Sequence, residues 1–377
     1  MVLRKQDSRP IRVLLIGPDL PIVGGQTVQA LMIIERFRND ADVHVDMQPI
    51  NPRFLPPMQR VKYLRTAVTS FKYLLDLITK VPRYDAVHIF SASYFSFILS
   101  PIPAGIISRI FRKKSILHYH SGEADDHFTR WKSAGPMTRI FDRIITPSNY
   151  LVDVFRKHKI DARSISNVVD MERFNYRTRS PISPVFLSSR SLEPLYNVEC
   201  TVRAFSIIQS LIPDASLVIA GDGSQRAMLA DLVKELELRN VEFLGMVQPD
   251  EMPSVYDRAD VFLNTPNVDN MPNSIIEAFA SGLAVVSTNA GGIPYIVDHE
   301  RNGLLVEKGD HEGIAQQALR LLSDPELARR ITEEALRDCE NYRWRSVRQQ
   351  WVGLYEELTM RTRYQAVAAD ERTSVTS

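Results

Sequence analysis

Two carboxylates, Asp269 and Glu277, bracket a run of polar side chains in the segment DNMPNSIIE. Between them lie Asn270, Asn273 and Ser274, directly before an apolar stretch that is typical of a helix. Carboxylates accept hydrogen bonds from hydroxyl groups, whereas the free amides at the start of a helix favour phosphate. The segment therefore has the chemistry to hold a ligand that carries both phosphates and hydroxyls. A plain helix cap is the alternative, because Ser274 and Glu277 also have the spacing of a capping box.

Two further polar side chains follow predicted strands. Arg190 comes directly after the strand-like run VFLSS, where its guanidinium would offer a fixed fork of donors to a diphosphate. A surface arginine at a strand end explains this position equally well. His120 ends the run SILHYH and could hydrogen-bond a sugar hydroxyl, with a purely structural histidine as the alternative.

Glycine-containing turns follow several predicted strands. Gly24 and Gly25 precede an amphipathic helix, so a substrate backbone or phosphate could approach the helix amides closely. A tight turn would explain this pair as well. Gly221 lies in the turn IAGDG, and Met246 with Val247 follows the run VEFLG, where backbone groups could contact the edge of a nucleobase.

The elements that must position these groups alternate between short β-rich runs and helical patterns, as in parallel sheets with crossover helices. We predict an α/β fold of two Rossmann-like, doubly wound domains that face each other across a cleft. The expected N-terminal domain is 1–170 and the C-terminal domain is 171–345, which begins with a linker-like segment at 171–184. A helix at about 346–365 is expected to pack back on the first domain, and 366–377 to form a disordered tail. Ligands of such sheets bind beyond the carboxyl ends of the strands, where the polar groups above lie.

Length and composition agree with a two-domain protein of a reducing compartment. The 377 residues exceed what one hydrophobic core usually organises. The two cysteines provide no disulfide framework and no metal-ligand spacing, and the polar start shows no signal peptide. Residues 1–170 carry 25 Lys/Arg and 15 Asp/Glu, whereas the remainder carries 21 and 30. This asymmetry indicates an anionic surface or acceptor near the first half, or simply a solvated basic face.

The segment VKYLRTAVTSFKYLLDLITK has the pattern of a basic amphipathic helix. Its apolar face would be formed by Val61, Leu64, Val68, Phe71, Leu75 and Ile78. Basic side chains lie on or beside the opposite face, with Asp76 as the only acid. We expect the apolar face to pack against a sheet, and an anionic membrane surface is the alternative partner.

Taken together, these residues resemble a retaining glycosyltransferase of family 4 (group 1), which has the GT-B fold. The likeness runs from IRVLLIG to about residue 350, and its pieces occur in the family's order. They are the Gly-Gly loop, HYHSG, NVVDMERF, Arg190, IAGDGSQRAML, VEFLGMV, the acid-x7-Glu element DNMPNSIIEA and GLAVVSTNAGG. The ordered set is specific, whereas any single piece is weak.

The resemblance implies a role for each matching position. Asp269 would lie beside the donor hexose, Arg190 would hold the diphosphate and stabilise the leaving nucleotide, and His120 would contact the donor sugar. Glu277 would bind the ribose hydroxyls. The remaining expected donor-binding residues are Gly24, Gly25, Asn197, Gly221, Met246, Val247, Asn270, Asn273, Ser274 and Ile275. No metal is expected, because helix termini and cations neutralise the leaving group.

The sequence departs from the family pattern at two places. A lysine that commonly follows the arginine is replaced here by Leu195 or Tyr196, which removes one charge from the diphosphate clamp. A lost charge-assisted hydrogen bond is worth about 1.5–3 kcal/mol. Asn197 and the helix amides would compensate, or turnover is slow, or the donor lies differently. The first acid is Asp269 followed by Asn270, where Glu-Gly is commoner.

The predicted function is the metal-independent, retaining transfer of a hexose-type sugar from a nucleoside-diphosphate sugar, with no cofactor. The acceptor would be a polysaccharide precursor or a lipid-linked molecule. The alternative is a catalytically weak or inactive nucleotide-sugar-binding protein of a glycan assembly complex. The expected location is cytoplasmic and peripheral, at an anionic inner membrane face, and no nucleic-acid partner is expected.

Overall fold

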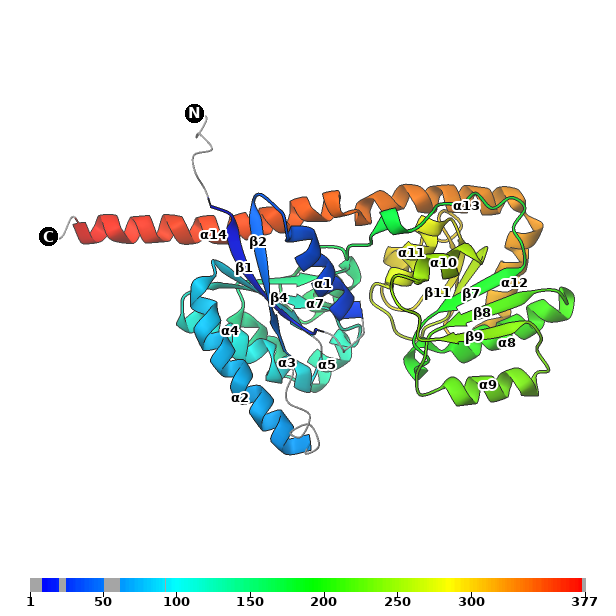
Figure 1. Cartoon of the computed structure of the whole chain (residues 1–377), viewed down its shortest axis with the longest axis horizontal. Helices are drawn as coiled ribbons and strands as arrows, with labels where there is room; N and C mark the ends of the chain where they lie inside the picture. The colour runs from blue at the N-terminus through cyan, green and yellow to red at the C-terminus, as the bar shows by residue number, and fades with distance from the viewer. Residues whose placement is uncertain (1–8, 20–24, 51–61, 92, 375–377) are drawn as a thin grey trace, which may run out of the picture. The chain divides into compact units, whose positions relative to one another are not determined.

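The computed structural model describes residues 9–19, 25–50, 62–91 and 93–374. Contacts divide the chain into two compact units. Unit 1 comprises Met1–Pro147, Leu151–Val168 and Arg345–Ser377, and unit 2 comprises Ser148–Tyr150 and Val169–Trp344. Figure 1 shows that each unit has its own sheet with helices packed around it.

Unit 1 is built on a six-stranded parallel sheet in the order β2-β1-β3-β4-β5-β6. Its strands are β1 (Ile11–Gly17), β2 (Val43–Pro49), β3 (Ala86–Ser91), β4 (Lys114–Tyr119), β5 (Arg143–Thr146) and β6 (Arg163–Ser164). The central strands are continuous runs of buried residues, as expected when helices cover both faces of a parallel sheet.

The helices of unit 1 join successive strands of this sheet. They are α1 (Gly25–Phe37), α2 (Lys62–Lys80), α3 (Phe95–Leu99), α4 (Pro101–Ile110), α5 (Ala124–Arg130), α6 (Ala134–Met137) and α7 (Asn149–Lys157). Among the described residues, no helix has the length and apolar character needed to cross a membrane.

The last helix, α14 (Trp344–Ser374), joins unit 1 through buried residues on one face and an ion pair. Trp351 and Tyr355 are almost fully buried, and the Arg348 guanidinium donates to the Asp40 carboxylate, with an Nε–Oδ2 distance of 2.5 Å. The helix continues to Ser374, whereas the sequence predicted a disordered tail from residue 366. Strong helix formers such as alanine, glutamate and arginine in AVAADERTS explain the extension.

Unit 2 has a second six-stranded parallel sheet, in the order β12-β11-β10-β7-β8-β9. The strands are β7 (Val185–Ser189), β8 (Ser216–Ala220), β9 (Val241–Gly245), β10 (Val261–Asn264), β11 (Ala284–Thr288) and β12 (Leu304–Val306). The helices are α8 (Val198–Leu211), α9 (Arg226–Glu235), α10 (Met252–Asp257), α11 (Asn273–Ser281), α12 (His311–Ser323) and α13 (Pro325–Asp338).

Hydrophobic cores on both faces of the second sheet explain its doubly wound form. Neighbouring strand residues point to opposite faces, so Phe186 joins one core cluster and Leu187 the other. The first cluster includes Phe205 of α8, and the second includes Phe279 of α11. The predicted fold class of two Rossmann-like α/β domains is confirmed.

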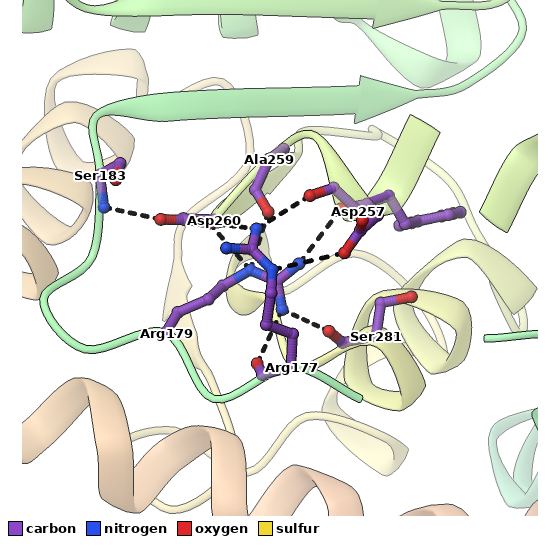
Figure 2. A network of polar contacts seen from close by, with 8 residues as sticks. Arg177, Arg179, Ser183, Asp257, Ala259, Asp260 and Ser281 are labelled. Carbon is purple, nitrogen blue, oxygen red and sulfur yellow. Dashed lines mark hydrogen bonds and ion pairs between the residues drawn. The ribbon is translucent and has the colours of Figure 1, made fainter. Parts of the chain in front are cut away.

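Part of the predicted linker segment 171–184 is bound tightly to unit 2 (Figure 2). Arg179 is buried, and its Nε donates to the Ala259 carbonyl at 2.8 Å and to Asp260 Oδ1 at 2.9 Å. The other carboxylate oxygen of Asp260 accepts the Ser183 amide at 2.7 Å. The polar composition that indicated an inter-domain linker therefore includes residues of a buried ion-pair network.

Candidate functional site

Arg190 contacts two polar side chains, those of Asp269 and Ser274, at the carboxyl ends of the unit 2 strands. It follows β7 directly, and its Nη2 forms an ion pair with the Asp269 carboxylate in the loop after β10. Its Nη1 donates to Ser274 Oγ in the first turn of α11 at 3.1 Å. The side chains of Arg190 and Asp269 are each only 11% exposed. The structure thus brings these three predicted residues together, although they lie far apart in the sequence.

Burial controls the protonation of the Asp269 carboxyl. Removal from water raises the pKa of Asp269, while the charge of the adjacent Arg190 acts in the opposite direction. The buried Nε of Arg190 has no hydrogen-bond partner among the described residues. An unpaired buried donor is costly, so a ligand oxygen that reached this group would be favoured.

Tyr196 lies at one of the two positions where the resemblance to family 4 glycosyltransferases would place a lysine. The guanidinium carbon of Arg190 lies 4.1 Å from the centre of the Tyr196 ring, which is a cation–π geometry. The ring therefore supports the arginine from one side and adds no second positive charge.

Asn197, which was expected to compensate for the missing lysine, takes part in a turn. Its backbone has a left-handed conformation with φ of 45°, and its carbonyl accepts from Thr265 Oγ1 at 2.9 Å. Its side-chain amide points to Asn267 Oδ1 at 3.4 Å. In this structure its polar groups hold the turn after β7 against the loop after β10.

The Glu277 carboxylate accepts a hydrogen bond from a tyrosine, and it does not cap the start of its own helix. Tyr256 Oη donates to Glu277 Oε2 at 2.8 Å and lies 2.8 Å from Ser189 Oγ. Helix α11 has Pro272 as its N-cap and no side-chain cap hydrogen bond, so the capping-box alternative is not realised. Burial raises the pKa of the Glu277 carboxyl, and the Tyr256 hydrogen bond partly opposes this shift.

The NAGG loop after β11 lies directly against the loop that carries Asp269. A Cβ atom on Gly291 would lie 2.0 Å from the Asp269 carbonyl oxygen, and one on Gly292 would lie 1.8 Å from that of Asn270. The Gly292 amide donates to the Asp269 carbonyl at 3.0 Å. Only glycine allows this close approach, which explains the Gly-Gly pair.

The loops after β8 and β9 lie next to the Arg190 position. Gly221 has φ of 151°, and a Cβ there would lie 1.9 Å from the Arg190 carbonyl oxygen. Its amide donates to the Gly245 carbonyl at 2.8 Å, which joins the two loops. Met246 follows with 62% exposure, while Val247 packs partly against the core. These backbone groups border the same strand-end region as Arg190.

The remaining predicted residues of α11 and its preceding loop have partners inside unit 2. Ser148 Oγ donates to the Asn270 side-chain oxygen, and Asn270 is buried. Asn273 begins α11, and the fully buried Ile275 uses its amide to donate to the Pro272 carbonyl at 3.2 Å. If the Ile275 amide also bound a phosphate, it would have to share its hydrogen between the phosphate and the Pro272 carbonyl.

His120 lies in unit 1, next to a cluster that also contains His118 and His88. Its ring centre is 4.1 Å from that of His118, whose Nδ1 lies 3.0 Å from His88 Nε2. Burial lowers the pKa of His120 to about 3, so the imidazole is neutral near pH 7.

Gly25 begins α1 with open space where a Cβ would lie, and Gly24 lies outside the described residues.

Tyr256 is the main site residue that sequence analysis missed. It lies on the short helix α10, is fully buried and touches both Glu277 and Ser189 through its hydroxyl. It lies between Val255 and Asp257, outside every motif named above, so the sequence gave no signal of this role. In the part of the chain that the structure covers, no cluster of three His, Cys, Asp or Glu side chains could hold a metal ion.

Two family sequence models match adjoining parts of the chain. Residues 173–338 match the family described as glycosyl transferases group 1, and residues 23–173 match glycosyltransferase family 4. Together they cover both units, and the first match contains Arg190, Asp269 and Glu277.

Curated relatives match this chain over part of its length. N-acetyl-alpha-D-glucosaminyl L-malate synthase of Bacillus anthracis is 28% identical over 233 residues, which is 59% of this chain and 59% of that protein. Sulfoquinovosyl transferase SQD2 of Arabidopsis thaliana is 32% identical over 188 residues, 47% of this chain and 36% of that protein. The chain therefore matches less than two thirds of either relative's own length.

Solved structures match over most of the chain. HepE of Anabaena in complex with UDP-glucose has a TM-score of 0.74 at 19% identity, covering 92% of this chain and 100% of that one. Sucrose-phosphate synthase of Thermosynechococcus elongatus has a TM-score of 0.75 at 20% identity, covering 92% and 99%. At such low identities the likeness shows the fold alone.

Proposed function

Because the chain belongs to the group 1 family of glycosyltransferases and has the two-domain GT-B fold, we propose that it is a retaining hexosyltransferase. It moves a hexose-type sugar from a nucleoside-diphosphate sugar to a polysaccharide precursor or a lipid-linked acceptor. The reaction needs no metal and no cofactor, and the protein works in the cytoplasm.

The observation that carries this proposal is the convergence of Arg190, Asp269, Ser274 and Glu277 at the strand ends of unit 2. Arg190 supplies a buried cation for the diphosphate, and the start of α11 lies beside it. Glu277 supplies a carboxylate for the ribose hydroxyls. Solved neighbours of the same fold support the donor class, since HepE of Anabaena was obtained with UDP-glucose.

In the proposed reaction the bond between the anomeric carbon and the diphosphate oxygen breaks, and the acceptor hydroxyl oxygen bonds to that carbon. The hydroxyl proton passes to a donor phosphate oxygen on the same face of the sugar. Arg190 stabilises the negative charge that develops on the leaving diphosphate. Asp269 lies beside the hexose, and the neutral His120 imidazole hydrogen-bonds a sugar hydroxyl.

A second function is favoured by the replacement of the family lysine. With Tyr196 beneath Arg190, the clamp has one cation where two are common. A nucleotide-sugar-binding protein that has lost transfer and acts in a glycan assembly complex would have such a site.

The test is a thermal-shift screen against UDP-, GDP- and ADP-sugars, followed by measurement of donor hydrolysis with the donor that binds. We expect one nucleotide class to raise the melting temperature and to be hydrolysed slowly without acceptor. Binding without hydrolysis or transfer to any glycan or lipid-linked acceptor would support the binding protein instead. No shift with any sugar nucleotide would overturn both functions.

A further inference from the structure

One face of α2 exposes large apolar side chains to solvent. Phe71 is 64% exposed, and Leu75 and Ile78 are each 48% exposed. The opposite face of the helix, with Tyr73 and Leu77, is buried. The prediction that Phe71, Leu75 and Ile78 pack against a sheet is therefore wrong, because the inward stripe of this helix lies at other positions.

The neighbouring helices α3 and α4 expose further apolar side chains. Phe95 is 73% exposed and Leu99 53% on α3, while Ile106 is 46% and Ile110 68% exposed on α4. Helix α4 packs against both α2 and α3, and Figure 1 shows α2 and α4 side by side in unit 1. The Tyr73 hydroxyl donates to the Ser100 carbonyl at 3.1 Å and so ties α2 to the junction of α3 and α4.

These side chains are concentrated in one stretch of the chain. Nine of the fifteen exposed large hydrophobic residues in the described parts of the protein lie between residues 71 and 110. We call them the α2–α4 face: Phe71, Leu74, Leu75, Ile78, Phe95, Ile98, Leu99, Ile106 and Ile110. The other six are scattered through unit 2. A concentration of this kind marks an interaction surface.

The stretch of chain that carries the α2–α4 face is rich in basic residues. Residues 62–114 contain nine Lys/Arg and two Asp/Glu. Both acids are already paired, Asp76 with Lys72 at 3.1 Å and Asp85 with Arg9 at 2.7 Å. Arg109, which is exposed, lies beside Ile110 in the last turn of α4. A second copy meeting this face through a two-fold axis would oppose like charges, whereas an anionic lipid surface would neutralise them.

We propose that the α2–α4 face docks on an anionic lipid bilayer. The exposed aromatic and aliphatic side chains enter the boundary between headgroups and acyl chains, and the surrounding Lys and Arg side chains bind the anionic headgroups. The surface belongs to unit 1, so docking does not depend on the transfer reaction or on a bound donor.

Co-sedimentation of the full chain with phosphatidylcholine vesicles, with and without phosphatidylglycerol, tests the proposal. We expect binding only with phosphatidylglycerol, weakened by high salt. The double variant Phe71→Asp/Phe95→Asp should bind about tenfold or more weakly, since both the apolar contact and the charge complementarity are reduced. The matched control is Leu211→Asp/Met228→Asp, which alters two exposed apolar residues of unit 2 and should bind as the wild type does.

Circular dichroism and thermal unfolding test whether both double variants keep the fold. We expect that they do, because all four side chains are exposed. Equal binding to both kinds of vesicle, or wild-type binding by Phe71→Asp/Phe95→Asp, would overturn the proposal. A dimer in solution that this variant abolishes, without vesicle binding by the wild type, would assign the face to a second copy and also overturn it. Since no donor is present, a failure of the proposed transferase function leaves this measurement unaffected.

Discussion

Arg190 is held on three sides, by the Asp269 carboxylate, the Ser274 hydroxyl and the Tyr196 ring. A guanidinium fixed in this way would lose little conformational freedom on binding the diphosphate that we propose as its ligand. The same contacts make the arginine costly to lose, because removal would leave the Asp269 carboxylate buried without its cation.

Tyr256→Phe tests the support of Glu277. The variant removes the hydroxyl that donates to the Glu277 carboxylate, and an unsatisfied buried group costs about 1–3 kcal/mol. We expect the free energy of unfolding in urea to fall by about that amount and the KM for donor to rise. The control is Tyr295→Phe at an exposed ring. Unchanged stability and KM in Tyr256→Phe would show that the hydroxyl does not hold Glu277.

Gly292→Ala tests the close contact between the NAGG loop and Asn270. The new Cβ would lie 1.8 Å from the Asn270 carbonyl oxygen, so the loops must move apart. Overpacking of this kind costs about 1–3 kcal/mol, and we expect weaker donor binding in calorimetry as well. Gly353→Ala is the control, and it should change the stability in the opposite direction. It has open space on α14 and should stabilise the helix by about 0.5–1 kcal/mol. A stable Gly292→Ala protein with wild-type donor affinity would contradict this account.

At the level of elements, Arg179 holds together parts of unit 2 that carry the candidate site. Its guanidinium donates to the carbonyl of Tyr256 on α10 at 3.3 Å and to that of Ser281 at the end of α11. Helix α10 supplies the Tyr256 hydroxyl, and α11 supplies Glu277. Arg179 is therefore a positioning residue for that contact, and Figure 2 shows how it lies among the surrounding carbonyl groups.

Arg179→Met should destabilise unit 2 strongly. It leaves the Asp260 carboxylate, whose side chain is 6% exposed, with only Arg177 as a charged partner at 3.0 Å. Breaking a buried ion pair costs about 3–5 kcal/mol, and Arg177 offsets part of this. The matched variant Arg177→Met removes a 48% exposed side chain and should cost about 1 kcal/mol or less. Urea unfolding measures both values, and equal effects would contradict the assignment of Arg179 as the central cation.

The alternation of strand and helix patterns predicted the parallel sheets, because buried strands such as VLLI read directly as apolar runs. The sequence order of motifs also predicted that Arg190, Asp269 and Ser274 lie together, since all three follow strands or begin a helix. The Tyr256–Glu277 contact could not be predicted, because nothing local distinguishes this tyrosine from a core residue. The sequence also could not show which face of α2 is exposed. Periodicity identifies the apolar stripes on a helix, but it does not tell which stripe packs against the rest of the protein.

At the scale of the whole molecule, the end of the chain completes its first unit. His88 Nδ1 lies 2.8 Å from the Tyr355 hydroxyl, and its ring centre is 4.5 Å from that of Trp351. His118 on β4 and His120, directly after this strand, extend the cluster. Helix α14 thus contacts this histidine cluster through the uncharged side chains of Trp351 and Tyr355.

This cluster predicts a loss of stability in acid. Burial lowers the pKa of His88 and His120 to about 3, and it lowers that of His118 well below its usual value. The unfolded chain takes up these protons below about pH 6.5, whereas the folded protein does not. The stabilising contribution is therefore present above pH 6.5 and is lost as the pH falls towards 3, by about 1.4 kcal/mol per pH unit for each histidine.

Urea unfolding followed by tryptophan fluorescence between pH 7.5 and pH 5 measures this dependence. We expect the free energy of unfolding of His118→Gln to depend less steeply on pH than that of the wild type, by the contribution of one histidine. The same slope in His118→Gln and the wild type would show that His118 does not titrate on unfolding.

The central claim is that Arg190 stabilises the leaving nucleotide of a sugar donor. The most direct measurement is the rate of nucleotide release from the donor found by thermal shift, for wild type, Arg190→Gln and Arg203→Gln. Arg203 is a matched control, because it is an arginine of unit 2 that pairs with Glu199 on the surface of α8. Loss of one oriented charge donor lowers kcat by about 100- to 1000-fold. We predict that loss for Arg190→Gln and a wild-type rate for Arg203→Gln, whereas a wild-type rate for Arg190→Gln would contradict the account.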